Sequence, residues 1–114
     1  MNKKNETAEK IQEMQILEQN LQSLTMQKQT FQLEFNEVTN AISELNKADE
    51  EVYRILGGIM IKSDKKSLLV ELEEKNKILE LRVSSIEKQE QLLEKKADEL
   101  RKDLTKSISE SKKQ

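Results

Sequence analysis

The sequence contains no cysteine, no histidine, no tryptophan and no proline, and only two glycines among its 114 residues. Without cysteine there is no disulfide, no thiol nucleophile and no cysteine-ligated metal. There is also no glycine-rich loop of the kind that cradles phosphates. No reaction class can be assembled from the remaining residues, so the sequence predicts a protein that is not an enzyme and that holds no cofactor or metal.

Bulky side chains are scarce as well. Aromatic residues make up 3% of the sequence, hydrophobic residues 34% and charged residues 37%. This is too little bulk for a compact core, whereas leucine recurs too regularly for a disordered chain. High Glu, Lys, Leu and Gln content without proline is typical of long helices and coiled coils. Most carboxylates fall on helix faces, which we interpret as solvated surface because two paired helices offer no concave pocket.

The charge pattern excludes some partners. Charged residues interrupt the N-terminal region, so no signal peptide or membrane span is predicted there, and the cytoplasm is the expected compartment. Residues 1–51 hold 5 Lys against 10 Asp and Glu, and residues 52–114 hold 15 Lys and Arg against 12 Asp and Glu. The two halves therefore attract modestly when packed together. Nucleic-acid binding is disfavoured because there is no strongly basic surface and few aromatic side chains.

Both glycines lie side by side at the middle of the chain, as Gly57 and Gly58. Residues 52–62 read Val-Tyr-Arg-Ile-Leu-Gly-Gly-Ile-Met-Ile-Lys. A Gly-Gly pair supplies the positive φ angles of a two-residue type I′ turn, so this stretch predicts a β-hairpin. The expected pairs are Leu56 with Ile59, Ile55 with Met60, Arg54 with Ile61 and Tyr53 with Lys62.

This predicted hairpin is apolar on both faces. Alternation puts Leu56, Ile59 and Ile61 on one face and Ile55 and Met60 on the other. A lone two-stranded hairpin is marginal in water, and its open edges favour pairing with further strands. We therefore predict that it is an oligomerisation surface made of Val52, Tyr53, Ile55, Leu56, Gly57, Gly58, Ile59, Met60 and Ile61.

Heptad patterns flank the hairpin and predict two long helices, over about residues 7–51 and 64–110. Ser63 and Asp64 are good N-cap residues for the second helix, and residues 107–114 are expected to loosen into coil. The first apolar seam contains Lys10, Met14, Leu17, Leu21, Leu24, Lys28, Phe31, Phe35, Val38, Ile42 and Leu45, and continues to Asp49 and Val52. The second contains Leu69, Leu72, Asn76, Leu79, Val83, Ile86, Glu90, Leu93, Ala97, Leu100 and Leu104.

The two seams are in register as an antiparallel pair. Leu45 with Leu69, and each of the ten further layers down to Lys10 with Leu104, has residue numbers that total 114. The sequence therefore predicts one domain over residues 1–114, dominated by α-helix: a long antiparallel two-helix coiled coil joined by a β-hairpin.

The polar seam residues leave alternatives open. Lys28 and Glu90 fall in adjacent layers, so they can pair across the seam and control its register, or Lys28 can extend its ammonium group to water. Asn76, which lies opposite Val38, can likewise control register or simply extend its polar group to water. The second, purely structural interpretation is favoured for Asn76.

Apolar residues outside the seams include Ile11, Ile16, Met26, Leu33, Ile78, Leu81, Leu92 and Ile108. Scattered exposed apolar residues are normal. Several of them, however, join seam residues near the free helix ends, where Lys10, Glu90 and Ala97 weaken the coil. Mobile helix ends with apolar side chains suit weak, unselective contacts. The predicted binding surface, called the tip cluster below, consists of Ile11, Met14, Ile16, Leu17, Leu92, Leu100, Leu104 and Ile108.

The order of these elements resembles a known family. A helix, the hairpin of residues 52–62 with its following Lys-Ser-Asp-Lys-Lys, and a helix carrying Leu-Glu-Glu-Lys-Asn-Lys-Ile-Leu-Glu-Leu-Arg together resemble the beta subunit of prefoldin, most like the archaeal form. The likeness is strongest over residues 52–104. The hairpin segment is its specific part, because the heptads match many unrelated coiled coils.

This resemblance implies an ATP-independent chaperone. It also implies a hexamer of two alpha-type and four beta-type subunits, in which the β-hairpin of this chain assembles with the others into an intersubunit β-barrel. The pooled hairpins would close into double β-barrels, which would remove open strand edges. The tips of the coiled coils hold unfolded proteins and pass them to a group II chaperonin. The alternative is a structural or tethering coiled-coil protein that dimerises alone and ignores an alpha-type partner.

Overall fold

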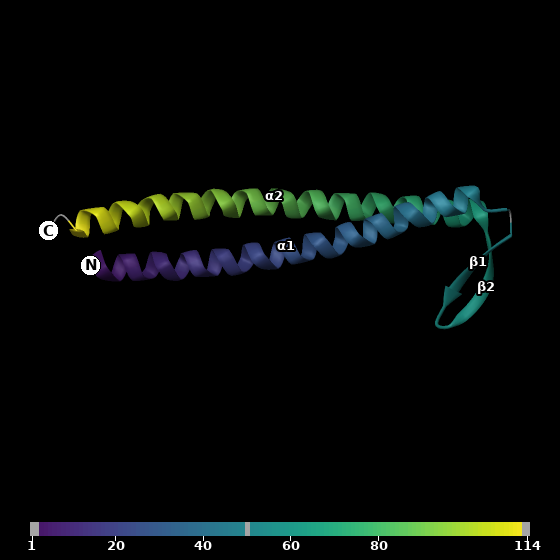
Figure 1. Ribbon diagram of the computed structural model, residues 1–114, viewed down its shortest axis with the longest axis horizontal. Helices are drawn as coiled ribbons and strands as arrows, with labels where there is room; N and C mark the ends of the chain where they lie inside the picture. Colours follow the sequence, from purple (N-terminus) through teal and green to yellow (C-terminus); the bar gives the residue numbers. More distant parts are fainter. Residues whose placement is uncertain (1–2, 50, 113–114) are drawn as a thin grey trace. The chain divides into compact units, whose positions relative to one another are not determined.

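The computed structural model describes residues 3–49 and 51–112. Helix α1 (Lys3–Lys47) is followed by strand β1 (Glu51–Leu56), strand β2 (Ile59–Asp64) and helix α2 (Lys65–Lys112). The two strands form an antiparallel hairpin that connects the end of α1 to the start of α2 (Figure 1). The predicted order of two long helices joined by a β-hairpin is therefore confirmed.

The helix boundaries differ from the predicted ones. Helix α1 ends at Lys47 rather than at residue 51, after the Ala48 backbone N–H has donated to the carbonyls of Glu44 and Leu45. The predicted end of the helix was wrong because residue 51 belongs to a strand. Glu51 pairs with Asp64, and an extended backbone cannot also be helical. Asp49, the last expected helical seam position, is exposed.

At the other boundaries the helices are longer than expected. Helix α1 begins at Lys3 instead of residue 7, and α2 continues to Lys112. Residues 107–112, which were expected to be coil, are therefore helical, whereas residues 113 and 114 lie outside the described residues. The serines and lysines there lower helix propensity only slightly, and no glycine or proline ends the helix.

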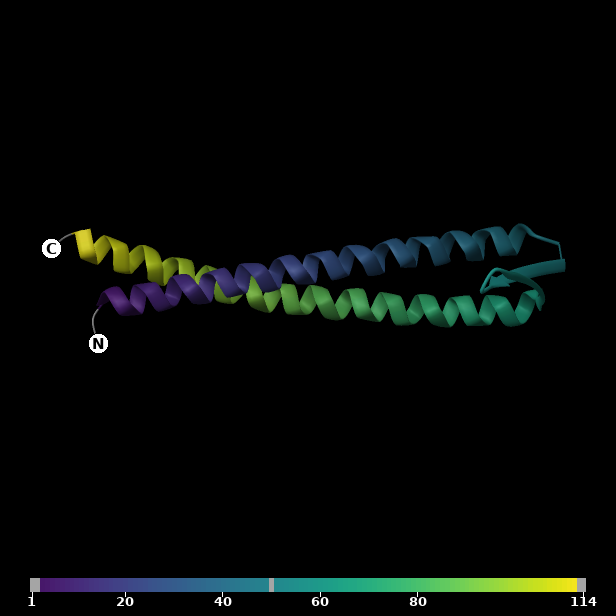
Figure 2. The same cartoon turned by 90° about the horizontal axis from the view of Figure 1, so that it is seen from below.

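The chain divides into two compact units, each containing part of both helices. The end unit comprises residues 3–28 and 85–112, and the hairpin unit comprises residues 29–84 with residue 50 left out. Figure 2 gives a second view in which the helix segments within each unit again run side by side.

In the end unit, the seam side chains Met14, Ile86 and Ala97 are buried together with Glu90. The contacts between its two helix segments include an ion pair from Lys28 to Glu90, with Nζ and Oε1 2.9 Å apart. Further toward the N-terminus, Leu17 lines a groove together with Leu100. Because an earlier residue of α1 meets a later residue of α2, the segments pair in the predicted antiparallel sense.

In the hairpin unit, Val38, Leu45, Val52 and Leu79 are buried, and Leu79 is the most enclosed of them at 2% exposure. Polar contacts flank this apolar seam. The Lys75 ammonium lies 3.2 Å from the Glu34 carboxylate. The Arg82 guanidinium of α2 lies 5.4 Å from the centroid of the Phe31 ring of α1, which is a cation–π distance.

Asn76 is held by a short hydrogen-bond chain. Its side-chain amide donates to Thr39 Oγ1 at 2.9 Å, and the Thr39 hydroxyl donates to the Phe35 carbonyl at 2.9 Å. The Asn76 Oδ1 atom is buried without a protein partner among the described residues. Asn76 therefore makes its side-chain hydrogen bond to the opposite helix, and control of register by this contact stays a prediction.

The predicted seams agree with the pattern of burial. Apart from Asp49, the seam residues given above are all buried or half-buried. The eight apolar residues expected outside the seams are all exposed. The heptad pattern thus separates the contact face of each helix from its solvent face correctly.

Candidate functional surfaces

The hairpin forms with the predicted register. Leu56 faces Ile59, Ile55 faces Met60, Arg54 faces Ile61 and Tyr53 faces Lys62, and the pairing continues to Glu51 with Asp64. Gly57 and Gly58 have φ angles of 55° and 79°, the left-handed values that a type I′ turn requires at both central positions. A side chain at either position would be disfavoured by the backbone angle rather than by a neighbour, because no atom lies within 4 Å of the added Cβ.

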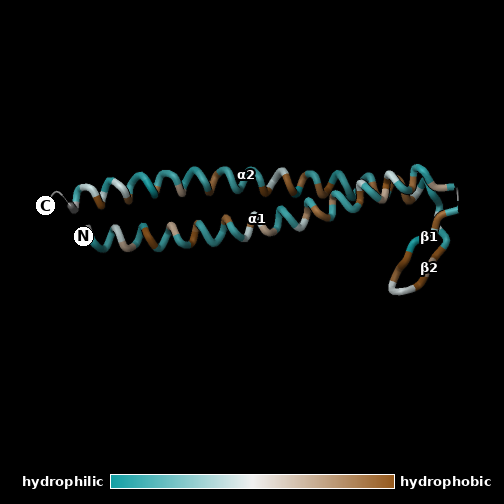
Figure 3. Tube along the Cα trace, viewed as in Figure 1, coloured by the Kyte–Doolittle hydropathy of each residue, from teal (hydrophilic) through white to brown (hydrophobic). Residues whose placement is uncertain are grey.

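Both faces of this hairpin expose apolar side chains. Val52 is buried, but Tyr53, Ile55, Leu56, Ile59, Met60 and Ile61 are 44–69% exposed. Figure 3 shows the hydrophobic colour running along both strands up to the glycine turn. The sheet has only these two strands within the described residues, so each strand has one unpaired edge. The exposed apolar hairpin thus lies where the sequence predicted it, and its role in assembly stays a prediction.

Two polar contacts hold the base of the hairpin. The Arg54 guanidinium makes two hydrogen bonds to the Glu71 carboxylate of α2, at 2.9 and 3.3 Å. The Lys65 ammonium donates to the Ala48 carbonyl at 2.9 Å, just beyond the end of α1. Sequence reasoning missed both contacts, because Arg54 looked like one more alternating strand residue and nothing in the sequence pairs Lys65 with residue 48.

Asp64 is the N-cap residue of α2, as predicted. Its Oδ2 atom accepts hydrogen bonds from the Ser67 hydroxyl at 2.9 Å and from the Ser67 backbone N–H at 3.1 Å. These bonds stabilise the carboxylate and hold the pKa of Asp64 below its ordinary value. The cap fixes the point at which the second strand becomes helix.

The tip cluster lies entirely on the helix segments of the end unit. Ile11, Ile16, Leu92 and Ile108 are exposed, Leu17, Leu100 and Leu104 are half-buried, and Met14 is buried. The four exposed members therefore offer apolar area directly, whereas Met14 contributes only if the helices separate.

Part of the tip cluster lines a groove of about 380 Å³. Its apolar members are Ile16, Leu17 and Leu100, and its charged members are Glu13, Lys96, Glu99 and Asp103. The lining positions follow three- and four-residue steps on each helix, so they share one face. The sequence identified the apolar residues of this groove but not the carboxylates beside them, which were interpreted as solvated surface.

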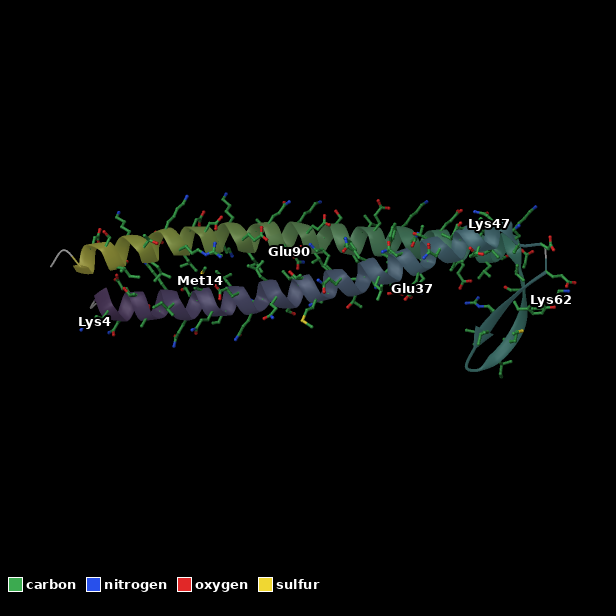
Figure 4. All side chains as sticks on the ribbon, in the orientation of Figure 1. Lys4, Met14, Glu37, Lys47, Lys62 and Glu90 are labelled. Atoms are coloured by element: carbon green, nitrogen blue, oxygen red, sulfur yellow. The ribbon has the colours of Figure 1, made fainter. Side chains whose placement is uncertain are left out.

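Glu90 is the one charged side chain that is buried among the described residues, at 8% exposure. Besides Lys28 it accepts a hydrogen bond from the Thr25 hydroxyl at 2.9 Å. The hydrogen bond with Lys28 lowers the pKa of Glu90 and raises the pKa of Lys28. The predicted pairing of Lys28 with Glu90 across the seam is confirmed. Figure 4 labels Glu90 on α2 and also Met14, another buried residue of this unit. Control of register by this pair stays a prediction.

Other kinds of site find no support in the described part of the chain. No group of three His, Cys, Asp or Glu side chains there lies close enough to hold a metal ion. In residues 3–49 and 51–112, neither helix has a stretch that is long and apolar enough to cross a membrane.

Comparison with known proteins identifies the family. A family model described as "Prefoldin subunit" matches residues 8–111. The chain belongs to the prefoldin family. Prefoldins are non-enzymatic chaperones, so the prediction that the chain is not an enzyme is confirmed.

The relatives place the chain beside prefoldin beta subunits, most of them archaeal. It is 37% identical to the prefoldin subunit beta of Thermoplasma volcanium over 93 residues, which covers 79% of this chain and 75% of that protein. It is 40% identical to the one from Thermococcus onnurineus over 85 residues, covering 73% of each chain. The crystal structure of the prefoldin beta subunit from Thermococcus strain KS-1 matches with a TM-score of 0.83 and 30% identity, covering 90% of this chain and 91% of that one. The predicted resemblance is therefore confirmed.

Proposed function

We propose that this chain is the beta-type subunit of a cytoplasmic prefoldin hexamer of two alpha-type and four beta-type subunits. It captures unfolded proteins with the tip cluster and delivers them to a group II chaperonin without hydrolysing ATP. The observation that carries the proposal is the presence of two separate sets of exposed apolar residues, one on the hairpin and one on the helix segments of the end unit.

The hairpin set is suited to assembly. Six apolar side chains on two faces bury little area within one chain, and two unpaired strand edges remain available for hydrogen bonding. Joining strands from several chains into a closed barrel satisfies both demands, because closure removes the edges and encloses one face. Membership of the prefoldin family favours such a barrel over a simple pair of hairpins.

The helix-end set is suited to client capture. An unfolded chain exposes apolar surface in excess, and burying that surface is the main favourable term in holding it. Each end unit offers only a few apolar side chains, so its own affinity is low. Several end units linked in one assembly raise the effective concentration for each further contact, and affinity rises without new kinds of contact.

The assembly step is tested by native mass spectrometry of the chain alone and with an alpha-type prefoldin subunit. We expect a complex of two alpha-type and four beta-type chains in the mixture. Changing Ile59 and Ile61 together to Lys should abolish it, because two ammonium groups cannot be buried in a barrel. Far-ultraviolet circular dichroism should show unchanged helix content, since neither residue is in a helix.

The tethering alternative gives a different result in the same experiment. A structural coiled coil would form a homodimer that ignores the alpha-type subunit and keeps its mass in the Ile59→Lys, Ile61→Lys variant. That pair of observations would overturn the proposed assembly.

A further inference from the structure

The groove in the end unit combines apolar and acidic side chains in a way that the tip cluster alone does not explain. Ile16, Leu17 and Leu100 supply its apolar surface. Three carboxylates, from Glu13, Glu99 and Asp103, stand around it against a single ammonium group from Lys96. The groove therefore has an excess of two negative charges beside an apolar surface.

These carboxylates are available for an outside partner. All three side chains are exposed. Across residues 3–49 and 51–112, none of the three takes part in an ion pair or a side-chain hydrogen bond. By contrast, Asp98 on the same helix is already paired with Arg101 at 2.8 Å.

The excess of negative charge extends over the groove and the depression that adjoins it. A second, polar depression shares Asp103 with the groove and brings two further ammonium groups, from Lys10 and Lys106, and two further carboxylates, from Glu6 and Glu110. Counted over both depressions, five carboxylates stand against three ammonium groups, so the excess of two negative charges persists. Basic side chains gather beside the groove on α2, at Arg101, Lys102 and Lys106, and with Arg101 and Lys102 included the carboxylates and cations balance at five each. The acidic excess is therefore confined to the groove and the depression next to it.

We propose that this groove selects, among unfolded segments, those in which apolar residues are flanked by Lys or Arg. The inference rests on the proposed client-binding function and names the class of client that this surface favours. Apolar client side chains would lie on Ile16, Leu17 and Leu100. The flanking cations would be drawn to the carboxylates, and complementary charge of this kind gives specificity and faster association more than raw affinity.

The test measures binding of three fluorescent peptides to the chain assembled with an alpha-type prefoldin subunit. The peptides share one apolar sequence and differ only in four flanking residues, which are all Lys, all Glu or all Ser. We expect the Lys peptide to bind about tenfold more tightly than the Glu peptide at low salt, because several exposed charge pairs of a few-fold each act together. This ratio should shrink in 0.5 M salt, where the screening length falls to about 4 Å.

Two matched variants locate the effect. Glu13→Gln, Glu99→Gln and Asp103→Asn together remove the groove carboxylates while keeping side-chain shape, and should reduce the Lys-to-Glu ratio to about twofold or less, since each lost charge pair was worth a few-fold. Glu9→Gln, Glu18→Gln and Glu80→Gln remove the same charge from exposed positions that do not line the groove, and should leave the ratio unchanged.

The possible outcomes distinguish a failure of this inference from a failure of the proposed client-binding function. If the Ser peptide binds but the ratio is the same in both variants, the groove does not select cationic segments and only the inference is overturned. The inference alone is also overturned if the Glu peptide binds as well as the Lys peptide. That result is expected if a second copy of this chain occupies the groove. If no peptide binds, the proposed client-binding function is wrong and the inference falls with it.

Discussion

The Glu90 carboxylate shows how one charged residue can be accommodated within a largely apolar seam. It is buried, and it is tolerated there because Lys28 and Thr25 satisfy its oxygens. A buried carboxylate without such partners would cost several kcal/mol. Each partner comes from the opposite helix, so the pair is satisfied in one alignment of the two helices and loses its contacts in a shifted one. This is the physical basis of the predicted control of register.

The pair makes the stability of the end unit dependent on pH. The pKa of Glu90 is lowered from its ordinary 4.5, so its contribution is present above that pH and is lost as the pH falls through the lower folded value. The pKa of Lys28 is raised from 10.5, so its contribution is present below that pH and is lost as the pH rises through the higher folded value. The pair therefore stabilises the folded chain between about pH 4.5 and 10.5.

Replacing Glu90 with Gln should lower the free energy of unfolding at pH 7 by about 1 kcal/mol, because the charge-assisted hydrogen bond to Lys28 is lost. The difference from the unmodified chain should shrink as the pH falls below 4.5 and through the lowered folded pKa of Glu90, because the carboxyl then takes up a proton and loses the charge-assisted bond. Thermal melting followed by circular dichroism measures both effects. Glu80→Gln, at an exposed position, is the control and should change little at any pH. A Glu90→Gln difference that stays constant down to pH 3 would contradict the assigned ion pair.

At the scale of the helices and strands, the heptad pattern decides which side chains are buried, and stability follows from that burial. Leu79 and Leu81 lie two residues apart on α2 and are the same type of residue, but Leu79 is 2% exposed and Leu81 is 69% exposed. They form an internal comparison in which helix propensity is matched and only packing differs.

Leu79→Ala should therefore destabilise the folded chain by about 2–5 kcal/mol, the usual cost of emptying a buried leucine site. Leu81→Ala should change the free energy of unfolding by less than about 0.5 kcal/mol, because its side chain is already in water and Ala is a good helix former. Chemical denaturation of the two variants measures the difference. Equal losses would show that the second seam is assigned to the wrong face.

The alignment of the two helices can be tested by crosslinking. Leu21 and Leu93 face each other in the predicted register and both belong to the end unit. A variant with Leu21→Cys and Leu93→Cys should form a disulfide within one chain under mild oxidation, since facing seam residues lie within disulfide reach. A variant with Leu21→Cys and Leu100→Cys is a full heptad out of register and should not. Comparable oxidation of both pairs, read by gel mobility, would mean that the alignment is wrong.

Some of these elements could be read from the sequence, and others could not. The hairpin register follows from Gly57 and Gly58 alone, because a two-residue turn fixes every later pair. The end of α1 was missed because residues 48–51 contain no glycine or proline, and strand pairing at Glu51 is decided by its partner Asp64. The contacts of Arg54 with Glu71 and of Lys65 with the Ala48 carbonyl join positions 17 residues apart, for which a heptad pattern has no rule.

At the scale of the whole molecule, the chain divides its apolar surface between two units. The hairpin unit carries the strand edges and apolar faces assigned to assembly, and the end unit carries the tip cluster and the acidic groove. Because the two surfaces belong to different units, substitutions in one can be expected to leave the other intact. We therefore predict that mutations can separate the proposed assembly function from the proposed client capture.

The most direct test of the central claim measures aggregation of a denatured client protein in the presence of the assembled complex. In the tip variant, Ile11, Ile16, Leu92 and Ile108 are changed together to Ser. In the control variant, Leu33, Val70, Ile78 and Leu81 are changed to Ser; these four are similarly exposed but belong to the hairpin unit. Light scattering and native mass are recorded for both variants.

We predict that both variants keep the mass of the full complex, that the control protects the client as well as the unmodified chain, and that the tip variant loses most of its protection. The reason is that the tip variant removes exposed apolar surface where clients are held, whereas the control removes a comparable amount elsewhere. A tip variant that assembles and still suppresses aggregation as well as the unmodified complex would contradict the account, because client binding would then lie elsewhere on the chain or on its partners.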